Sequence, residues 1–129
     1  MDKGSQADRR QLTRYKVNGD FYLTFWPSLD RIGRLKDVSG GGVSFEYAVL
    51  DRKDEVDEVE VNVFSARPDS FVLWGVPCKV VYDTRVEQPT LSGVETRRCG
   101  LQFQTLSNQQ SNQLQVLLRQ YVSNPVPAY

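Results

Sequence analysis

Most of the chain alternates between apolar and polar residues with a period of two, which is the pattern of strands that bury one face. The alternation is clearest at 43–47 (Val-Ser-Phe-Glu-Tyr) and at 58–63 (Glu-Val-Glu-Val-Asn-Val). Other runs rich in β-branched and aromatic residues predict strands at 20–26, 31–38, 71–82 and 95–106. Turn residues or charged loops separate these runs at short intervals. This regular spacing of short strands predicts a mainly all-β fold, either a small antiparallel barrel or a sandwich.

Two local features modify this pattern. Gly75 and Pro77 interrupt the run at 71–82, so we expect a bend or a bulge there. A single helix is predicted after the last strand, because Ser107 is a favourable N-cap and Gln110 completes a capping box. The apolar residues that follow fall on one helical stripe: Leu114, Leu117, Leu118 and Tyr121. We expect this stripe to close one open end of the barrel.

The chain of 129 residues suits one domain with a single core. We expect a polar, mobile segment at 1–8 and a domain at 9–122. Asn124-Pro125 should stop the helix, which leaves a loose tail at 123–129.

Sixteen basic and sixteen acidic residues leave the chain without net charge. Bulk binding to nucleic acid or to an anionic membrane needs a basic excess, so neutrality argues against both. The charges are unevenly placed, because the first residues are locally basic whereas 51–60 is acidic, and we interpret the acidic run as a solvated loop and strand face. Since the chain lacks a long apolar stretch and a signal-peptide core, we expect a bacterial cytoplasmic protein without membrane insertion.

The chain contains no histidine, which excludes Ser–His and Cys–His nucleophilic sites and histidine-ligated metals. Cys78 and Cys99 lack the Cys-x-x-Cys spacing of zinc sites, and both lie in apolar runs that favour buried, reduced thiols over a disulfide. Neither a phosphate-binding P-loop nor a recognisable pair of catalytic carboxylates is present. We therefore expect a binding protein rather than an enzyme, without a metal or a cofactor.

The first candidate motif is Arg10-Gln11-Leu12-Thr13-Arg14. Arginine offers a rigid fork of donors that suits phosphates and the acceptor edge of guanine. Two arginines four residues apart start ~13 Å apart in extended chain, or about 6 Å apart on one face of a helix, and either spacing can clamp a ligand. Such a pair often arises by chance. Here Arg9 precedes it in a segment with little apolar content, which favours a mobile basic arm that orders on an anion.

The second candidate motif is Asp37-Val38-Ser39-Gly40-Gly41-Gly42. An ionised aspartate accepts hydrogen bonds from the N1 and N2 donors of guanine, and a serine hydroxyl can donate to a phosphate. These residue types are also the commonest in turns, so the motif could simply join two strands. Three glycines exceed what a hairpin requires, which favours close approach to the backbone or amides that face an anion.

Together the two motifs resemble the signature of the PilZ domain family, whose members are bacterial receptors for cyclic di-GMP. The segment Arg98-Cys99-Gly100-Leu101-Gln102-Phe103, with a capped helix after it, is similar to the end of that domain. The resemblance covers nearly the whole chain. It implies a six-stranded antiparallel β-barrel with one C-terminal α-helix.

The resemblance also implies a ligand site made of Arg9, Arg10, Arg14, Asp37, Ser39, Gly41 and Gly42. In that site the motif arginines would hold guanine edges and phosphates. Asp37 and Ser39 would contact guanine and the phosphodiester ring, and Gly42 would permit the turn and close approach. In the family an arginine at the position of Arg9 tends to accompany a stacked ligand dimer, so we expect two ligands per chain.

Three further residues lie near the site in the family arrangement. Tyr82 could contact a base, although a core or rim position is the simpler interpretation. For Arg97 and Arg98 the sequence favours solvated surface side chains.

The function that follows is a receptor or adaptor for cyclic di-GMP that orders its arginine arm on the ligand. It would signal to an unidentified effector protein in motility, biofilm formation or a related output. One alternative keeps the PilZ fold but makes it an interaction adaptor with weak or no ligand binding. Another is a small β-barrel that binds nucleic acid through the aromatic strand at 20–26, which the neutral charge disfavours.

Overall fold

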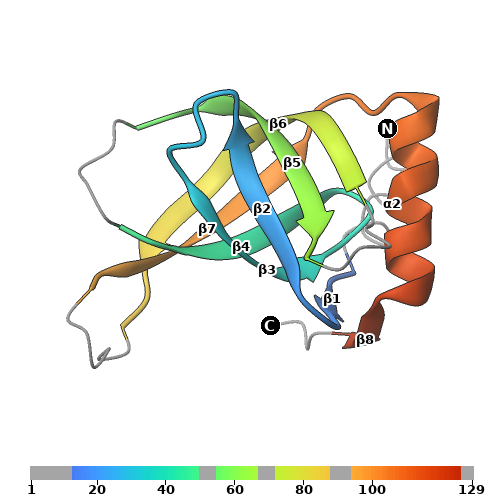
Figure 1. The fold of residues 1–129 in the computed structure, drawn as a ribbon, viewed down its shortest axis with the longest axis horizontal. Coiled ribbons are helices and arrows are strands. Elements are labelled where there is room, and N and C mark those ends of the chain that lie inside the picture. The colour runs from blue at the N-terminus through green and yellow to red at the C-terminus, as the bar shows by residue number, and fades with distance from the viewer. Residues whose placement is uncertain (1–12, 50–54, 67–71, 88–93, 126–129) are drawn as a thin grey trace, which may run out of the picture.

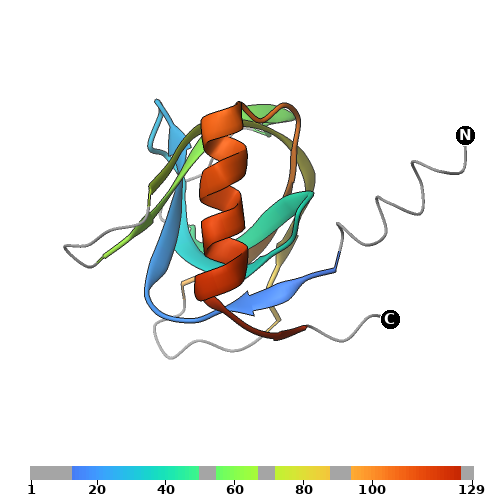
Figure 2. The same ribbon diagram turned by 90° about the vertical axis from the view of Figure 1, so that its right-hand side faces the viewer.

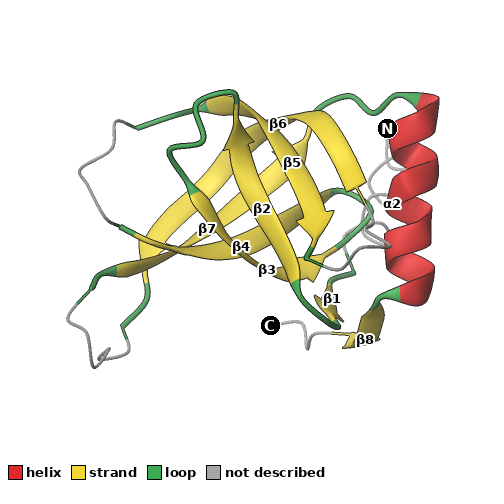
Figure 3. Ribbon diagram, in the orientation of Figure 1, coloured by secondary structure: helices red, strands yellow, loops and turns green. Residues whose placement is uncertain are grey.

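A computed structural model of the chain describes residues 13–49, 55–66, 72–87 and 94–125. Its elements in chain order are β1 (Tyr15–Val17), β2 (Phe21–Trp26), β3 (Ile32–Val38), β4 (Gly42–Ala48), β5 (Glu58–Ser65), β6 (Val72–Arg85), β7 (Thr96–Phe103), α2 (Asn108–Gln120) and β8 (Val122–Pro125). The strands predicted from the sequence are thus confirmed, and they make up most of the described chain (Figure 3).

The strands form one antiparallel sheet that closes on itself (Figure 1). Its order is β2-β5-β6-β7-β4-β3-β1-β8, and β2 also pairs with β3, so β2 to β7 make a closed barrel of six strands. The short strands β1 and β8 extend the sheet beyond β3. The six-stranded antiparallel barrel with a C-terminal helix is therefore confirmed.

Alternation along the strands places one face of each barrel strand in the core. Of the apolar residues predicted at 43–47 and 58–63, five are buried there, namely Val43, Phe45, Tyr47, Val61 and Val63, and Val59 is partly buried against them. Aromatic contacts join distant strands, since the Phe25 ring on β2 lies 5.7 Å from the Phe45 ring on β4. A shared core of this kind fixes the barrel strands relative to one another.

Helix α2 lies across one open end of the barrel (Figure 2). Its predicted capping box is present, because Gln110 N–H donates to Ser107 Oγ at 3.1 Å and Ser107 N–H donates to Gln110 Oε1 at 2.9 Å. Leu114 and Leu117 are buried in the core, and the Tyr121 ring meets Phe21 edge-on. The predicted closure is confirmed. Within the described ranges, no helix has both the length and the apolar character needed to cross a membrane.

The end of the chain differs from its prediction. The helix ends at Gln120 rather than at Asn124, and Val122–Pro125 form β8, which pairs with β1. The expectation of a loose tail from residue 123 is wrong for residues 123–125. An edge strand such as β1 presents unpaired N–H and C=O groups that accept a further strand, and no local sequence pattern reports that opportunity.

The predicted irregularity in β6 is confirmed at Gly75. This glycine has φ +67°, and the register between β5 and β6 shifts opposite it, between Val61 and Val63. The Gly75 N–H donates to Asn62 Oδ1 at 2.7 Å, which satisfies an amide that the irregular pairing leaves outside the ladder.

Both cysteines are buried and free, as the sequence predicts. Burial raises the pKa of the Cys78 thiol to about 12, with a further contribution from Cys99. Burial, and then the negative charge of Asp83, raises the pKa of Cys99 to about 12 as well. Because the thiolate is the reactive form, both thiols should be inert near neutral pH.

We therefore expect neither cysteine to react with Ellman's reagent at pH 8 in the folded protein, and both to react in concentrated urea. Absorbance at 412 nm measures the reaction, and the unfolded protein serves as the positive control. Rapid reaction of either thiol under native conditions would contradict the burial described here.

Candidate functional site

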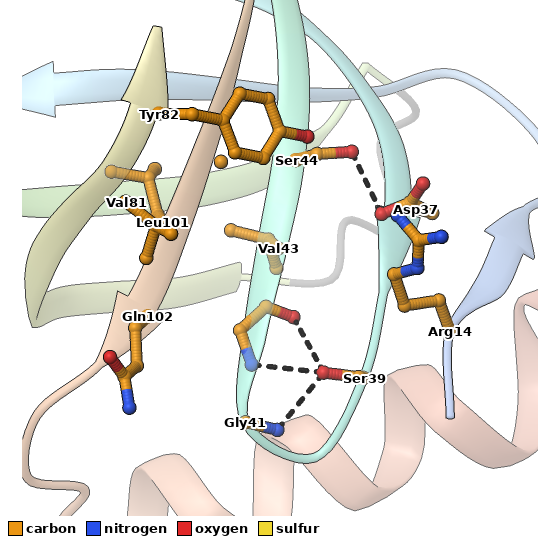
Figure 4. A pocket seen from close by; sticks show the side chains of 12 residues that line it. Arg14, Asp37, Ser39, Gly41, Val43, Ser44, Val81, Tyr82, Leu101 and Gln102 are labelled. Atoms are coloured by element: carbon orange, nitrogen blue, oxygen red, sulfur yellow. Dashed lines mark hydrogen bonds between the residues drawn. The ribbon is translucent and has the colours of Figure 1, made fainter. Parts of the chain in front are cut away.

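The predicted site residues that the structure describes line one pocket on the outer side of the barrel (Figure 4). They are Arg14 before β1, Asp37 in β3, Ser39 and Gly41 in the following turn, and Gly42 at the start of β4. The cavity measures about 350 Å³, and the rest of its wall comes from Val43, Ser44, Val81, Tyr82, Gly100, Leu101 and Gln102. Arg9 and Arg10 lie outside the described residues.

Asp37 is held in a buried polar cluster. Its side chain is only 4% exposed, Oδ1 accepts from Ser44 Oγ at 2.8 Å, and Oδ2 accepts from Arg98 Nη2 at 2.7 Å. The Arg98 guanidinium also lies 3.8 Å from Glu46 Oε2. A carboxylate has room for more than two hydrogen bonds, so Asp37 keeps accepting capacity for a ligand donor.

Ser39 fixes the turn between β3 and β4. Its Oγ accepts from the N–H groups of Gly41 and Gly42, both at 3.1 Å, and its own N–H donates to Gly42 O at 2.8 Å. The sequence suggested amides free to face an anion, and that interpretation is wrong for these two glycines. Ser39 itself is buried, so its hydroxyl supports the shape of the pocket wall.

Gly42 is required by strand packing. A Cβ atom at this position would lie 2.1 Å from the carbonyl oxygen of Leu101 on the neighbouring strand β7. Among the described glycines, φ is positive at Gly19 and Gly75 and not at Gly42. The backbone conformation at position 42 therefore does not require a glycine. The close approach predicted at this glycine is therefore an approach of β7 to β4.

A model of the PilZ domain family matches residues 8–120 of the chain. The chain belongs to the PilZ family. The resemblance drawn from the two motifs is confirmed, and the matched range includes every predicted site residue. Among solved structures, the PilZ chain is similar to the PilZ domain with c-di-GMP of YcgR from Escherichia coli, at 17% identity with a TM-score of 0.63. The alignment covers 85% of this chain and 89% of that one, and the likeness is one of fold. No curated protein matches the sequence.

Tyr82 forms one wall of the pocket in this PilZ domain. It lies on β6 opposite Gly100 on β7, and a Cβ atom on Gly100 would come within 2.1 Å of the Tyr82 ring. The ring therefore packs flat across the glycine. Tyr82 occupies the rim position that the sequence favoured, with its ring beside the cavity (Figure 4).

A second, wider groove adjoins the pocket at Asp37 and measures about 1000 Å³. Its basic side chains outnumber its acidic ones, since Lys16, Arg34, Lys36, Arg85 and Arg98 face Asp37 and Glu46. A groove lined mainly by one sign of charge attracts ions of the other sign. This side of the PilZ domain therefore favours an anionic ligand.

The expectation that Arg97 and Arg98 are solvated is wrong. Arg97 donates from Nε to Asp83 Oδ1 and from Nη1 to Glu95 Oε2, both at 2.9 Å, whereas Arg98 pairs with Asp37. The bonds to Glu95 and Asp83 raise the pKa of Arg97 further above its ordinary value. Hydrogen bonding across strands depends on register, which the sequence pattern does not report.

Asp83 also joins a network at the barrel end opposite α2. Tyr47 Oη donates to Asp83 Oδ2 at 2.7 Å and accepts from Arg31 Nε at 3.3 Å. Burial and the bond to Asp83 raise the pKa of Tyr47. Within the described ranges, no group of three or more Asp, Glu, Cys or His side chains is placed to hold a metal ion.

Proposed function

We propose that this PilZ domain is a receptor for cyclic di-GMP and that the pocket beside Asp37 is its binding site. The observation that carries the proposal is that one cavity is lined by Arg14, Asp37 and the Ser39 turn. These groups differ in chemistry, and Arg14 is far from the other two in sequence. The solved PilZ domain of YcgR, which has the same fold, contains c-di-GMP. The adjoining basic groove suits an anionic dinucleotide.

Each polar group of the pocket has a distinct role in this proposal. Asp37 accepts hydrogen bonds from the donor edge of guanine, and the hydrogen bond from Arg98 holds its carboxylate in the orientation that this contact needs. Arg14, together with Arg9 and Arg10, binds phosphates and the acceptor edge of guanine. The Ser39 turn holds the wall rigid, and Tyr82 offers an aromatic face beside the cavity.

The arginine arm supplies the conformational part of the proposal. We infer that Arg9 and Arg10 order on the ligand and that the adjoining groove holds a second, stacked ligand molecule. A receptor whose arm orders on a ligand can present a new surface to an effector protein. Because cyclic di-GMP is a bacterial messenger, we place this function in the bacterial cytoplasm. Ligand binding and contact with an effector account for it, so the proposal includes no catalytic step.

Isothermal titration calorimetry with cyclic di-GMP tests the site. We expect two ligands per chain, and binding at least about tenfold weaker in Arg10→Ala and Arg14→Ala, because a bidentate charge-assisted contact contributes roughly 1.5–3 kcal/mol. Arg14→Lys should recover only part of the loss, since an ammonium lacks the two-pronged geometry. Arg119→Ala, in the last turn of α2, is the matched control and should bind like the parent.

The outcomes separate the alternatives. Unchanged binding in both arginine variants would show that the site is misplaced, and a ratio of one ligand per chain would remove the stacked pair. No heat with cyclic di-GMP would favour an adaptor without a ligand. A titration with GTP and with an oligonucleotide distinguishes a nucleic-acid module, which would respond to the oligonucleotide alone.

A further inference from the structure

Both tryptophans of the chain lie together on the outside of the barrel. The rings of Trp26 on β2 and Trp74 on β6 are 5.8 Å apart at an angle of 53°, and the residues are 38% and 51% exposed. Ile32 at the start of β3 and Leu29 in the β2–β3 turn are also exposed, at 57% and 55%. We call these four residues together with Glu60 the tryptophan surface.

Strand alternation explains how Glu60 joins the aromatic pair. Phe25 on β2 and Val61 on β5 point into the core, so their neighbours Trp26 and Glu60 point outward. The register pairs Trp26 directly with Glu60, and β5 separates β2 from β6 in the sheet. Glu60 therefore lies on β5, the strand between the two strands that contribute the tryptophans.

A second aromatic pair lies on the outer face of β2 and β5. The rings of Tyr22 and Phe64 lie 6.0 Å apart and continue the line of the tryptophan pair. Asn62, outward-facing between these pairs, is fully buried, and its Nδ2 has no hydrogen-bond partner among the described residues. Exposed aromatic surface on a soluble domain commonly marks a site of protein interaction, and tryptophan is among the residues that contribute most binding energy there.

Charge identifies the occupant of this surface. Glu60 belongs to the tryptophan surface itself, whereas Glu55 and Asp57 are exposed in the segment before β5 and line a neighbouring cavity. Within the described residues none of the three takes part in an ion pair. A nucleic acid or an anionic membrane would be repelled by these carboxylates. A second copy of the chain would place the same acidic surface against itself across a two-fold axis, which is also repulsive. A cationic partner is the complementary choice.

Arginine fits the tryptophan surface better than lysine does. Its planar guanidinium stacks on indole rings, which are the strongest cation–π partners, and it can form two parallel hydrogen bonds to a carboxylate. The exposed side chains of Ile32 and Leu29 add apolar contact beside this position. An extended segment that alternates arginine with apolar residues would match both features.

We propose that the tryptophan surface is the docking site for an arginine-bearing segment of a partner protein, with one guanidinium against Trp26, Trp74 and Glu60. This surface is separate from the nucleotide pocket. In the barrel order, β2 and β5 lie across the core from β7 and β4, and Figure 1 shows β2 and β5 on the near side. Both sites can be occupied together, and the inference does not depend on what the pocket binds.

Indole N–H resonances test the proposal directly, because the only two tryptophans of the chain belong to this surface. The probe is a capped pentapeptide that alternates arginine and leucine, titrated into the ¹⁵N-labelled full chain. We expect saturable shifts of both indole signals. Glu60→Gln should weaken binding severalfold without disturbing packing, and Trp74→Ala should abolish it. The peptide with glutamate in place of arginine should leave both signals unchanged.

Matched controls keep the result interpretable. Glu87→Gln removes an exposed carboxylate elsewhere, and Val81→Ala removes exposed apolar surface at the nucleotide pocket; both should bind the peptide like the parent. The proposal is overturned by an absence of shifts, by equal binding in Glu60→Gln, or by displacement of the peptide on addition of cyclic di-GMP. Indole shifts caused by a deoxythymidine oligonucleotide, by vesicles of phosphatidylglycerol or by raising the protein concentration alone would equally overturn it.

Discussion

Gly42→Ala is expected to destabilise the barrel by about 3 kcal/mol or more, because backbone atoms of two strands compete for the same space. The new Cβ would lie 2.1 Å from Leu101 O and 3.1 Å from the Leu101 carbonyl carbon, distances that force β4 and β7 apart. The strands pair continuously from Gly42↔Gln102 to Ala48↔Thr96, so a local separation breaks several ladder bonds. Urea unfolding followed by circular dichroism measures the loss.

Gly75→Ala separates crowding from backbone conformation. An added Cβ at Gly75 would meet nothing within 4 Å, but φ there is +67°. The expected loss is therefore the conformational cost alone, about 1–2 kcal/mol. If Gly42→Ala were no more destabilising than Gly75→Ala, close packing of β4 on β7 could not be the reason for glycine at position 42.

The second large effect is expected at Arg98. Arg98→Ala should lower the free energy of unfolding by about 2 kcal/mol, since removing one partner of a buried pair leaves the other charge uncompensated. Asp37 is almost fully buried, with 4% of its side chain exposed, but the Arg98 side chain is 35% exposed. Because solvent screens the exposed partner, the loss of stability should be smaller than for a fully buried ion pair. Ser44 remains as a donor to Asp37, which limits the loss further.

A double-mutant cycle isolates this interaction. Asp37→Asn removes the charge that Arg98 compensates, so Arg98→Ala should cost markedly less in that background than in the parent. Arg85→Ala, an exposed arginine on β6, serves as the control and should change stability by no more than about 0.5 kcal/mol. Additive losses from Asp37→Asn and Arg98→Ala would show that the two side chains do not act as a pair.

Features that depend on local sequence were predictable, and features that depend on register were not. The Ser107 capping box and the apolar stripe of α2 follow from residues within one or two turns. Period-two alternation identified β4 and β5, but barrel and sandwich share that alternation, and the choice came only from family resemblance. Closure rests on the β2–β3 pairing, a contact that alternation cannot reveal.

In the candidate site, too, local motifs were predictable and contacts that depend on strand register were not. Short motifs in the chain led to Arg14, Asp37 and the Ser39 turn, and the structure gathers them on one pocket. The role of Arg98 is not predictable in this way, because its partner Asp37 is 61 positions away in sequence and is brought near it by two strand pairings, β3 with β4 and β4 with β7. Likewise, the role of Gly42 in strand packing needs the position of Leu101, which no motif contains.

The pairing of β1 with β8 brings the first and last described strands of the chain to the same edge of the sheet. Lys16 on β1 is in turn paired with Asp37 on β3, so this edge is a close neighbour of the pocket. A fluorescent protein or solid support joined next to either strand would begin beside the proposed nucleotide site. Attachment through an engineered cysteine at Gln109, an exposed position in the first turn of α2 and so at the helix end away from β8, would leave that edge clear for binding measurements.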